Sequence, residues 1–388
     1  MKKTLFWFLL LIVCITSFWW LADILITSKK EYNQFRGAAH TRQLYAQKGG
    51  AIGIAAAGDW SLHPSLLNGI NFAAEKLNKT GGLLGRIIKL IPVDDKGSLD
   101  GAFEAAQQIC DQAGTLFIIG HSDDRLTRAV VQNYEFYGIL MISPLSANLT
   151  QSQKNFQFIF SNSTPIETIA EKLLKLTKEK HWSRVSITYD ASDINTRQAH
   201  YFESILMSDN IKIPQLLGIY PDQVREHLKT QIKNQLDNLQ TDSLIIIAGI
   251  QDSLNIIRTY RAAGFNKPIV IDKKPDHHTI TTNHHLFKNV YCPLQINTET
   301  SEYNQFYQSY LKRFNTLPDI AAVSGYDTLM ILANAIKKTQ SLEAIKIAEN
   351  MKSFKHDHSL TGTIGFDSNG NAVKTPFNFG PASLNNSL

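Results

Sequence analysis

Short polar loops that follow apolar runs carry most of the residues in this sequence that are equipped for chemistry. One such loop follows the apolar run 116–119 and contains Ser122, Asp123 and Asp124. Hydroxyl and carboxylate groups of this kind bind polar ligands, and adjacent carboxylates can also serve acid–base chemistry. In open α/β sheets the loops at the carboxyl ends of the strands border a common crevice. We therefore expect the loops that follow successive strands to converge on one site.

The candidate ligand contacts are the side chains of these strand-end loops. In the first half of the chain they are Asp59, Trp60, Ser61, Ser122, Asp123, Asp124, Leu145, Ser146 and Ala147. In the second half they are Ser192, Asp193, Ile194, Ile250, Gln251, Asp252, Lys273 and Lys274. A binding cleft needs a few convergent polar groups among apolar walls, which this set offers. For each single residue, an ordinary solvated loop position is an equally good interpretation.

Two further groups of polar residues favour a structural interpretation over a chemical one. Asp94 and Asp95 resemble a catalytic pair, but a strand-end loop with solvated charges explains them better. Four histidines lie within nine residues, and such tracts can bind zinc or copper. They are His277, His278, His284 and His285. Adjacent histidines point in different directions and no cysteine joins them, so we predict an exposed loop, with no metal and no cofactor.

Several function classes are disfavoured by what the sequence lacks. It contains no G-x-S-x-G, no P-loop, no H-E-x-x-H and no G-x-G-x-x-G at a strand end, so we do not expect an enzyme. The net charge of +5 is spread along the chain without a basic block, which argues against a nucleic-acid partner. The three cysteines have no metal-binding spacing.

Apolar runs alternate with amphipathic stretches along the chain, as in β–α–β units. The predicted strands are 51–57, 87–94, 116–119, 139–142, 184–189, 211–219, 243–248 and 268–271. The predicted helices are 64–78, 99–113, 126–137, 165–178, 197–207, 224–239, 254–263, 302–314, 321–337 and 342–351. Continuous apolar runs suit parallel strands that are buried on both faces, so the pattern predicts doubly wound α/β sheets. The Asp/Asn/Gly-rich stretch 366–371 predicts a hairpin turn.

The N-terminal segment predicts a membrane attachment. Residues 5–26 are mainly apolar, follow Lys2 and Lys3, and are long enough to span a bilayer. We interpret residues 1–27 as an uncleaved anchor, because no small-residue cleavage site follows closely. A cleaved signal peptide and lipidation at Cys14 are the alternatives, and the bulky Val13 disfavours lipidation. Residues 28–49 predict a polar, partly helical tether, and residues 50–380 the folded body.

Five motifs carry a family resemblance. The run IIGH with the following helix, and YGILMISP continuing into LT, resemble the first lobe of bacterial branched-chain amino-acid-binding proteins. NKTGGLLGRIIKLIPVDDKG and SGYDTLMILANAI resemble further segments of these type I periplasmic solute-binding proteins, and LTGTIGFDSNGN resembles their last segment. The resemblance implies two Rossmann-like lobes joined by three crossovers, near Ser163, near Cys292 and within 352–360. It places the first lobe at about 50–163 and 294–355, and the second at about 164–293 and 356–380.

The sequence departs from that family at the ligand. In the family, loops after GH and ISP hold the ligand's α-carboxylate and ammonium groups. Here Asp124 stands in place of a serine donor, Ala147 in place of a threonine, and Ile194 in place of a tyrosine. Lys273 or Lys274 falls near the acid that holds the ammonium group. A carboxylate cannot donate a hydrogen bond to another carboxylate, so we expect a ligand other than a branched-chain amino acid. The acidic first-lobe loop favours a cationic or hydroxyl-rich ligand, and the lysines can meet an anionic group.

These features together predict an extracytoplasmic solute-binding protein. It would serve as the substrate-binding component of an ABC transporter, with the permease as membrane partner. The body would face the periplasm or the cell exterior, anchored to the cytoplasmic membrane through the N-terminal helix. Two alternatives remain: a sensory subunit that regulates a membrane signalling partner, and an interaction module that has lost ligand binding.

Overall fold

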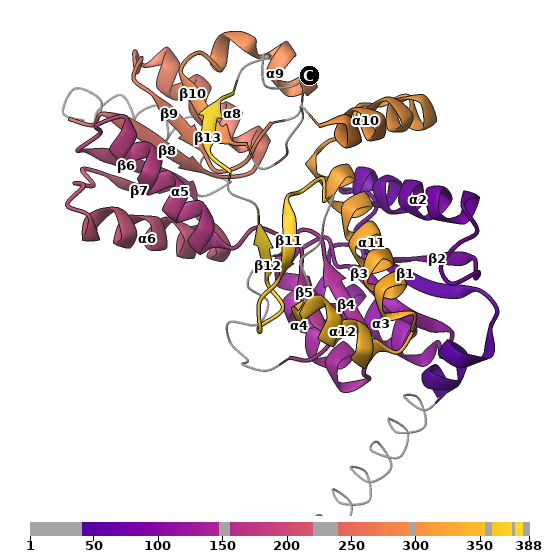
Figure 1. The fold of residues 1–388 in the computed structure, drawn as a ribbon. Coiled ribbons are helices and arrows are strands. Elements are labelled where there is room, and N and C mark those ends of the chain that lie inside the picture. The colour runs from indigo at the N-terminus through magenta and orange to yellow at the C-terminus, as the bar shows by residue number, and fades with distance from the viewer. Residues whose placement is uncertain are drawn as a thin grey trace, which may run out of the picture.

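A computed structural model shows two α/β lobes side by side (Figure 1). It describes residues 41–146, 156–219, 240–275, 277–294, 296, 300–353, 359–374 and 377–382. The predicted anchor 1–27 and the predicted helix 224–239 lie outside these residues. Within the described ranges, no helix is both long enough and apolar enough to cross a bilayer.

The first lobe contains a parallel five-stranded sheet in the order β2-β1-β3-β4-β5. Its strands are β1 (Ile52–Gly58), β2 (Ile88–Asp94), β3 (Thr115–Gly120), β4 (Leu140–Ser143) and β5 (Ile159–Ser161). All residues of β1, β3 and β4 are buried. The continuous apolar runs in the sequence therefore mark strands covered on both faces.

Helices cover both faces of this sheet. On one face lie α2 (Pro64–Lys79), α11 (Ile320–Thr339) and α12 (Ala344–Ser353), and on the other α3 (Leu99–Asp111) and α4 (Asp124–Phe136). Side chains of β1 alternate between the two cores, with Ile52 and Ile54 in one and Ala55 and Ala57 in the other. Helix α10 (Ser301–Phe314) packs on α2 through an aromatic cluster around Phe72.

The second lobe contains a six-stranded sheet in the order β13-β10-β9-β8-β6-β7. Its strands are β6 (Val185–Asp190), β7 (Leu216–Ile219), β8 (Ser243–Ile247), β9 (Ile269–Ile271), β10 (Val290–Pro293) and β13 (Phe379–Pro381). All pairs are parallel except β10 with β13. Helices α5 (Ile166–Glu179) and α6 (Asp193–Ser208) cover one face, and α8 (Ile250–Ala262) and α9 (His277–Thr282) cover the other.

Helical structure in the second lobe is more extensive than the sequence predicted. Helix α6 begins at Asp193 rather than at 197, because the Ser192 hydroxyl caps it by accepting a hydrogen bond from the Asn195 amide. Helix α8 begins at Ile250, so the predicted loop 249–252 is mostly helical. The histidine tract is helical rather than the predicted loop, since α9 and the 3-10 turn His284–Leu286 occupy it, but His284 and His285 are exposed as predicted. That segment is helical because Ile280 and Leu286 are buried in the second-lobe core.

The predicted hairpin forms, but it lies on the first lobe rather than the second. Its strands are β11 (Thr363–Phe366) and β12 (Ala372–Lys374), which pair antiparallel. Phe366 stacks edge-on against Phe160 with ring centroids 5.3 Å apart, and the Ser161 amide donates to the Gly370 carbonyl at 2.8 Å. The predicted assignment of 356–380 to the second lobe is therefore wrong for the hairpin. The chain crosses after Lys374, and β13 then joins the second sheet.

The last part of the predicted tether is folded onto the first lobe. Residues 41–48 are helical, and the buried Arg42 side chain donates a hydrogen bond to the Cys110 carbonyl. Arg86 donates to the carbonyls of Ala46 at 2.6 Å and Gly50 at 2.8 Å. These bonds satisfy the carbonyls at the end of the short helix, which fixes where the chain enters the lobe.

Candidate ligand-binding site between the lobes

A cavity of about 840 Å³ lies between the lobes and is lined by residues of both. Its first-lobe wall follows the carboxyl end of β3, and its second-lobe wall follows the carboxyl ends of β6, β8 and β9. In each sheet, the chain first adds a strand on one side of the starting strand and then adds the next strands on its other side. This change of side lies between β1 and β3 in the first sheet and between β6 and β8 in the second. Such switch points are where open α/β sheets bind ligands.

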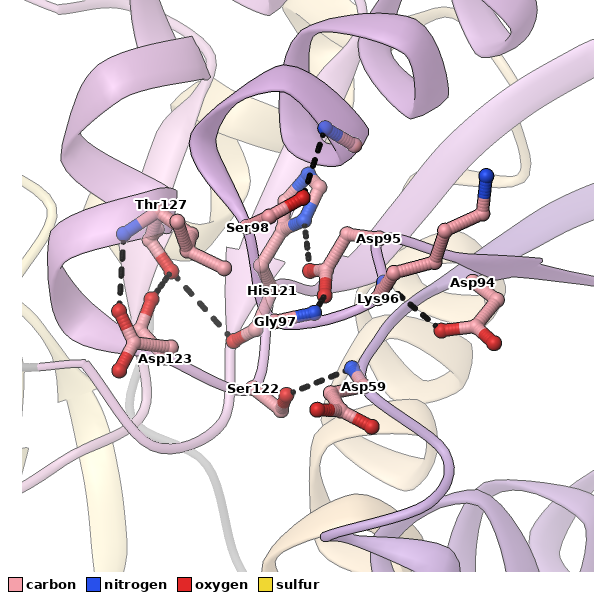
Figure 2. Close-up of polar contacts among 12 residues, drawn as sticks. Asp59, Asp94, Asp95, Lys96, Gly97, Ser98, His121, Ser122, Asp123 and Thr127 are labelled. Carbon is pink, nitrogen blue, oxygen red and sulfur yellow. Dashed lines mark hydrogen bonds and ion pairs between the residues drawn. The ribbon is translucent and has the colours of Figure 1, made fainter.

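The start of α4 forms the polar part of the first-lobe wall. Asp123 caps this helix by accepting a hydrogen bond from the Leu126 amide at 3.0 Å. Asp124, in the first turn, forms an ion pair with Arg128 one turn later. The Ser122 hydroxyl accepts a hydrogen bond from the Asp59 amide at 3.0 Å (Figure 2). Both acids of the loop predicted from the sequence therefore have partners within the protein, the Leu126 amide for Asp123 and the Arg128 guanidinium for Asp124.

A buried network behind this wall holds the strand ends in place. His121 Nδ1 lies 2.7 Å from Asp95 Oδ2 (Figure 2), and its Nε2 lies 2.8 Å from the Tyr134 hydroxyl. Asp95 and His121 are both fully buried, so the prediction of a solvated charge at Asp95 is wrong. Burial raises the pKa of Tyr134 well above its usual value, which keeps the phenol protonated. Both imidazole nitrogens are thus occupied by structural partners.

Gly120 is required where β3 turns into this loop. It has a φ of +146°, and a Cβ built on it would lie 2.2 Å from the Ala57 carbonyl oxygen. No side chain fits that space, because β1 passes directly beside the turn. The GH pair of the sequence is therefore a steric and hydrogen-bonding unit of the frame rather than a ligand contact.

The second-lobe wall is cationic. Lys273 and Lys274 line the cavity, and Lys273 Nζ lies 3.3 Å from the Ala248 carbonyl oxygen and 3.7 Å from Asp272 Oδ2. Burial raises the pKa of Asp272, whose carboxylate also accepts a long hydrogen bond from Gln198 at 3.3 Å. Burial lowers the pKa of Lys274. On this part of the wall, Lys273 and Lys274 therefore lie next to one buried acid, Asp272.

Two arginines line the cavity from opposite lobes. Arg128 belongs to α4 and Arg197 to α6. Burial lowers the pKa of Arg128, and the positive charge of Arg197 lowers it further. The cavity therefore has one arginine on each lobe, and their like charges oppose each other.

The remaining lining is mainly apolar and aromatic. Tyr303 and Tyr307 of α10 contribute rings whose centroids lie 6.2 Å apart. Further apolar lining residues are Leu145, Ile166, Ile169, Ile250, Pro275, Pro293, Ile296, Leu317, Pro318, Ile320 and Val323. Such walls accommodate the apolar body of a small organic molecule.

The structure brings part of the predicted site together. The predicted contacts that line the cavity are Ser122, Asp123, Asp124, Leu145, Ser192, Ile250, Lys273 and Lys274. The predicted contacts Asp59, Trp60, Ser61, Ser146, Gln251 and Asp252 do not line it. Ala147 lies outside the described residues, as do the side chains of Asp193 and Ile194.

The predicted residues outside the lining have identifiable structural roles. The Asp59 carboxylate accepts hydrogen bonds from the Ser61 amide at 2.9 Å and the Ser61 hydroxyl at 2.6 Å, which shapes its own loop. Ser146 is fully buried and bonds to the Thr127 hydroxyl at 2.9 Å. Gln251 is exposed in the first turn of α8. The prediction that Asp59, Ser146 and Gln251 contact the ligand is therefore not supported by their positions.

Sequence reasoning missed polar lining residues that lie on helices or shortly before them. These residues are His63, Arg128, Ser163, Thr164, Glu167, Asn195, Arg197, Gln198, Tyr201 and Asp319. The cap residues Asp123 and Ser192 carried the signal that α4 and α6 begin early enough to reach the cleft. Among the side chains that the structure describes, no group of three or more His, Cys, Asp or Glu residues is arranged to hold a metal ion.

A sequence profile described as "Periplasmic binding protein" matches residues 55–384. The leucine-specific-binding protein of Salmonella typhimurium is 28% identical over 156 residues, which are 39% of this chain. This match spans only 41% of that relative's length. An amino acid binding protein of Pseudomonas aeruginosa is 30% identical over 92 residues, 24% of this chain and 25% of that protein.

Solved structures share the fold at low sequence identity. The branched-chain amino acid transporter substrate-binding protein LivJ of Streptococcus pneumoniae, in complex with isoleucine, superimposes with a TM-score of 0.73. The identity is 20%, and the match covers 88% of this chain and 97% of that one. A solute-binding protein of R. palustris in complex with benzoate gives a TM-score of 0.75 at 16% identity, covering 87% and 95%.

Proposed function

This chain belongs to the periplasmic binding protein family, and we propose that it is the extracytoplasmic solute-binding component of an ABC transporter. The observation that carries the proposal is the cavity of about 840 Å³ between two doubly wound lobes. A solute in this cavity contacts both lobes at once, so its binding energy favours the closed arrangement of the lobes. A permease that recognises the closed form would then receive only loaded protein.

We propose that the solute is bound without chemical change. Among the described cleft residues, Ser122 is the hydroxyl nearest in sequence to a histidine, yet its oxygen accepts from the Asp59 amide. His121 is occupied on both ring nitrogens by Asp95 and Tyr134. A serine nucleophile needs an adjacent base to activate it, and neither ring nitrogen of His121 is available to accept a proton from Ser122.

We propose that residues 1–27 anchor this body to the cytoplasmic membrane, with the cleft on the outer side. The support is the apolar run 5–26 in the sequence and the family's extracytoplasmic location. The permease of the transporter would be the partner in the membrane. Permease and ATPase genes beside this gene would favour transport, whereas a kinase or cyclase gene would favour the sensory alternative.

We further propose that the ligand is not a branched-chain amino acid. Asp124 pairs with Arg128 at the first-lobe wall, so its carboxylate does not offer a donor to an α-carboxylate. Lys273 and Lys274 line the opposite wall, where an ammonium group would meet like charge. The benzoate complex of the R. palustris protein shows that this fold also holds a carboxylate without an ammonium group.

Calorimetry with leucine, isoleucine and valine tests the ligand proposal. One lost hydrogen bond to a charged group costs about 1.5–3 kcal/mol, so two losses weaken binding by roughly two to four orders of magnitude. We expect no dissociation constant in the micromolar range for any of the three. The leucine-specific-binding protein of Salmonella typhimurium is the positive control. A micromolar constant for this chain would contradict the proposal.

Solute binding itself is tested by dialysis. The full-length chain, kept in detergent, is dialysed against a bacterial metabolite extract and then against buffer. Heat-released solutes are identified by mass spectrometry, with heat-denatured protein as the control. We expect one solute class retained at close to one molecule per chain. Retention of nothing above the denatured control would contradict a solute-binding function and favour an interaction module.

A further inference from the structure

Four cations of the described residues line the cavity, together with five acids, and the solute-binding role alone does not account for the cations. We infer that the cleft takes a solute with a carboxylate or phosphate group and no ammonium group, held between Arg128 of the first lobe and Arg197 and Lys273 of the second. This inference rests on the proposed function, because it names the class of solute that the same cleft binds. Carboxylate and phosphate oxygens are the acceptors that guanidinium groups bind best.

Arg197 is the clearest sign of an anion site. It is exposed in the second turn of α6 and lines the cavity. Among ion pairs between the described side chains, none includes Arg197, whereas Arg128 already has Asp124 as a partner. An arginine that faces a cleft without a carboxylate partner has donor capacity available for a ligand.

Because Arg197 and Arg128 lie on opposite lobes, the charge of the ligand should affect how readily the lobes close. Their charges repel, and the repulsion grows as the lobes approach and water leaves the cleft. An anion placed between them replaces this repulsion with two attractive contacts. A neutral or cationic solute leaves the repulsion in place, so it gains less from closure.

Five acids of the described residues also line the cavity, and four of them have hydrogen-bond or ion-pair partners within the protein. Asp123 and Asp319 cap α4 and α11 and accept backbone amides at 3.0 Å and 2.8 Å. Asp124 is paired with the arginine of its own helix, and Asp272 is buried beneath the neighbouring lysine. The fifth acid, Glu167, lies on α5 near Tyr201, whose pKa its charge raises in addition to the effect of burial. Its negative charge lies on the same lobe as three cations.

Dialysis of the full-length chain against a metabolite extract tests the class of solute. We expect the retained solutes to be anions at neutral pH, with a carboxylate or phosphate group and no amine, as judged by accurate mass and fragmentation. A retained zwitterion, cation or uncharged solute would overturn this inference and leave the proposed function standing. Retention of nothing would overturn both.

The retained solute is then titrated into charge variants. Arg197→Gln should weaken its binding at least about tenfold, because a charged contact is lost. Arg197→Lys should weaken it less, since the charge remains without the planar fork. Arg258→Gln is the matched control, because Arg258 is also an exposed arginine on a second-lobe helix but does not line the cavity. Equal affinity in Arg197→Gln and Arg258→Gln would overturn the assignment of Arg197.

Discussion

Lys374 should make the stability of the folded chain depend on pH. It ends β12, and its ammonium nitrogen lies among four oxygen atoms although part of the residue is exposed. These are the Asn162 carbonyl, Asn162 Oδ1 at 3.2 Å, Thr361 Oγ1 at 3.0 Å and Thr363 Oγ1 at 2.7 Å. Burial lowers the pKa of Lys374 from 10.5 to about 7, although the charge of Asp327 acts in the opposite direction.

The sign and size of the effect follow from this pKa. Above pH 7 the folded protein holds Lys374 neutral, while the unfolded chain keeps it protonated up to its ordinary pKa of 10.5. Unfolding therefore takes up a proton, and a rise in pH opposes unfolding. Linkage then predicts that the free energy of unfolding increases by about 2 kcal/mol between pH 7 and pH 9.

Urea unfolding followed by circular dichroism at pH 7 and pH 9 measures this increase. Lys374→Met removes the titrating group, so its free energy of unfolding should lack the rise of about 2 kcal/mol seen in the wild type. Lys89→Met, at an exposed position of β2, should keep the wild-type rise. If Lys374→Met and wild type change equally between the two pH values, Lys374 is not the group that titrates.

Two further substitutions test the frame of the cleft by thermal unfolding. Gly120→Ala should destabilise the protein severely or prevent folding, because its Cβ would lie 2.2 Å from the Ala57 carbonyl oxygen. Gly114→Ala, where an added Cβ would have no neighbour closer than 4.0 Å, should stay within about 0.5 kcal/mol of wild type, and equal losses would contradict the steric argument. Asp95→Ala should cost about 2–3 kcal/mol because it leaves a buried imidazole N–H without an acceptor. The exposed Asp94→Ala is its control, and a neutral Asp95→Ala would show that the buried network is not stabilising.

The strands and turns of the two lobes were predictable because the sequence signals that mark them are local and depend on strict steric limits. Buried parallel strands such as β1 and β3 are continuous apolar runs, and each of the two ends in a glycine at a place where no Cβ fits. The Asp/Asn/Gly turn of the β11–β12 hairpin was predictable for the same reason, since Asp367 accepts the amides of Asn369 and Asn371 at 2.9 Å. The match over residues 55–384 confirms the resemblance to periplasmic binding proteins that these motifs carried.

The placement of the hairpin was not predictable from its own residues. Phe366 and Ala372 give the hairpin one apolar face, but the sequence of a short hairpin does not indicate which hydrophobic core that face will cover. The structure places the face against Phe160 at the edge of the first sheet. Tertiary packing of this kind depends on which edge strand is left uncovered, and that is a property of the assembled sheet.

The charges of the cleft were misjudged because the helix boundaries were misplaced. Asp124 and Arg128 have the i, i+4 spacing of a helical ion pair. The predicted helix began only at 126, so this ion pair was not predicted. Arg197 was placed at the start of a helix rather than in its second turn. With the caps Asp123 and Ser192 taken into account, both arginines fall on helix ends that face the cleft.

Stability and the proposed solute-driven closure should depend on separate groups, which mutation can separate. Asn162 directly follows β5 and Lys374 ends β12, so the two residues mark where two connections leave the first lobe. Lys374 donates to the Asn162 carbonyl, and the Asn162 amide donates to the Thr328 hydroxyl of α11 at 3.0 Å. These bonds hold both exit points to the first lobe. Arg197 lies on the second lobe and lines the cavity opposite Arg128 of the first lobe. Substitution of Lys374 should therefore alter unfolding with little effect on solute affinity, whereas substitution of Arg197 should do the reverse.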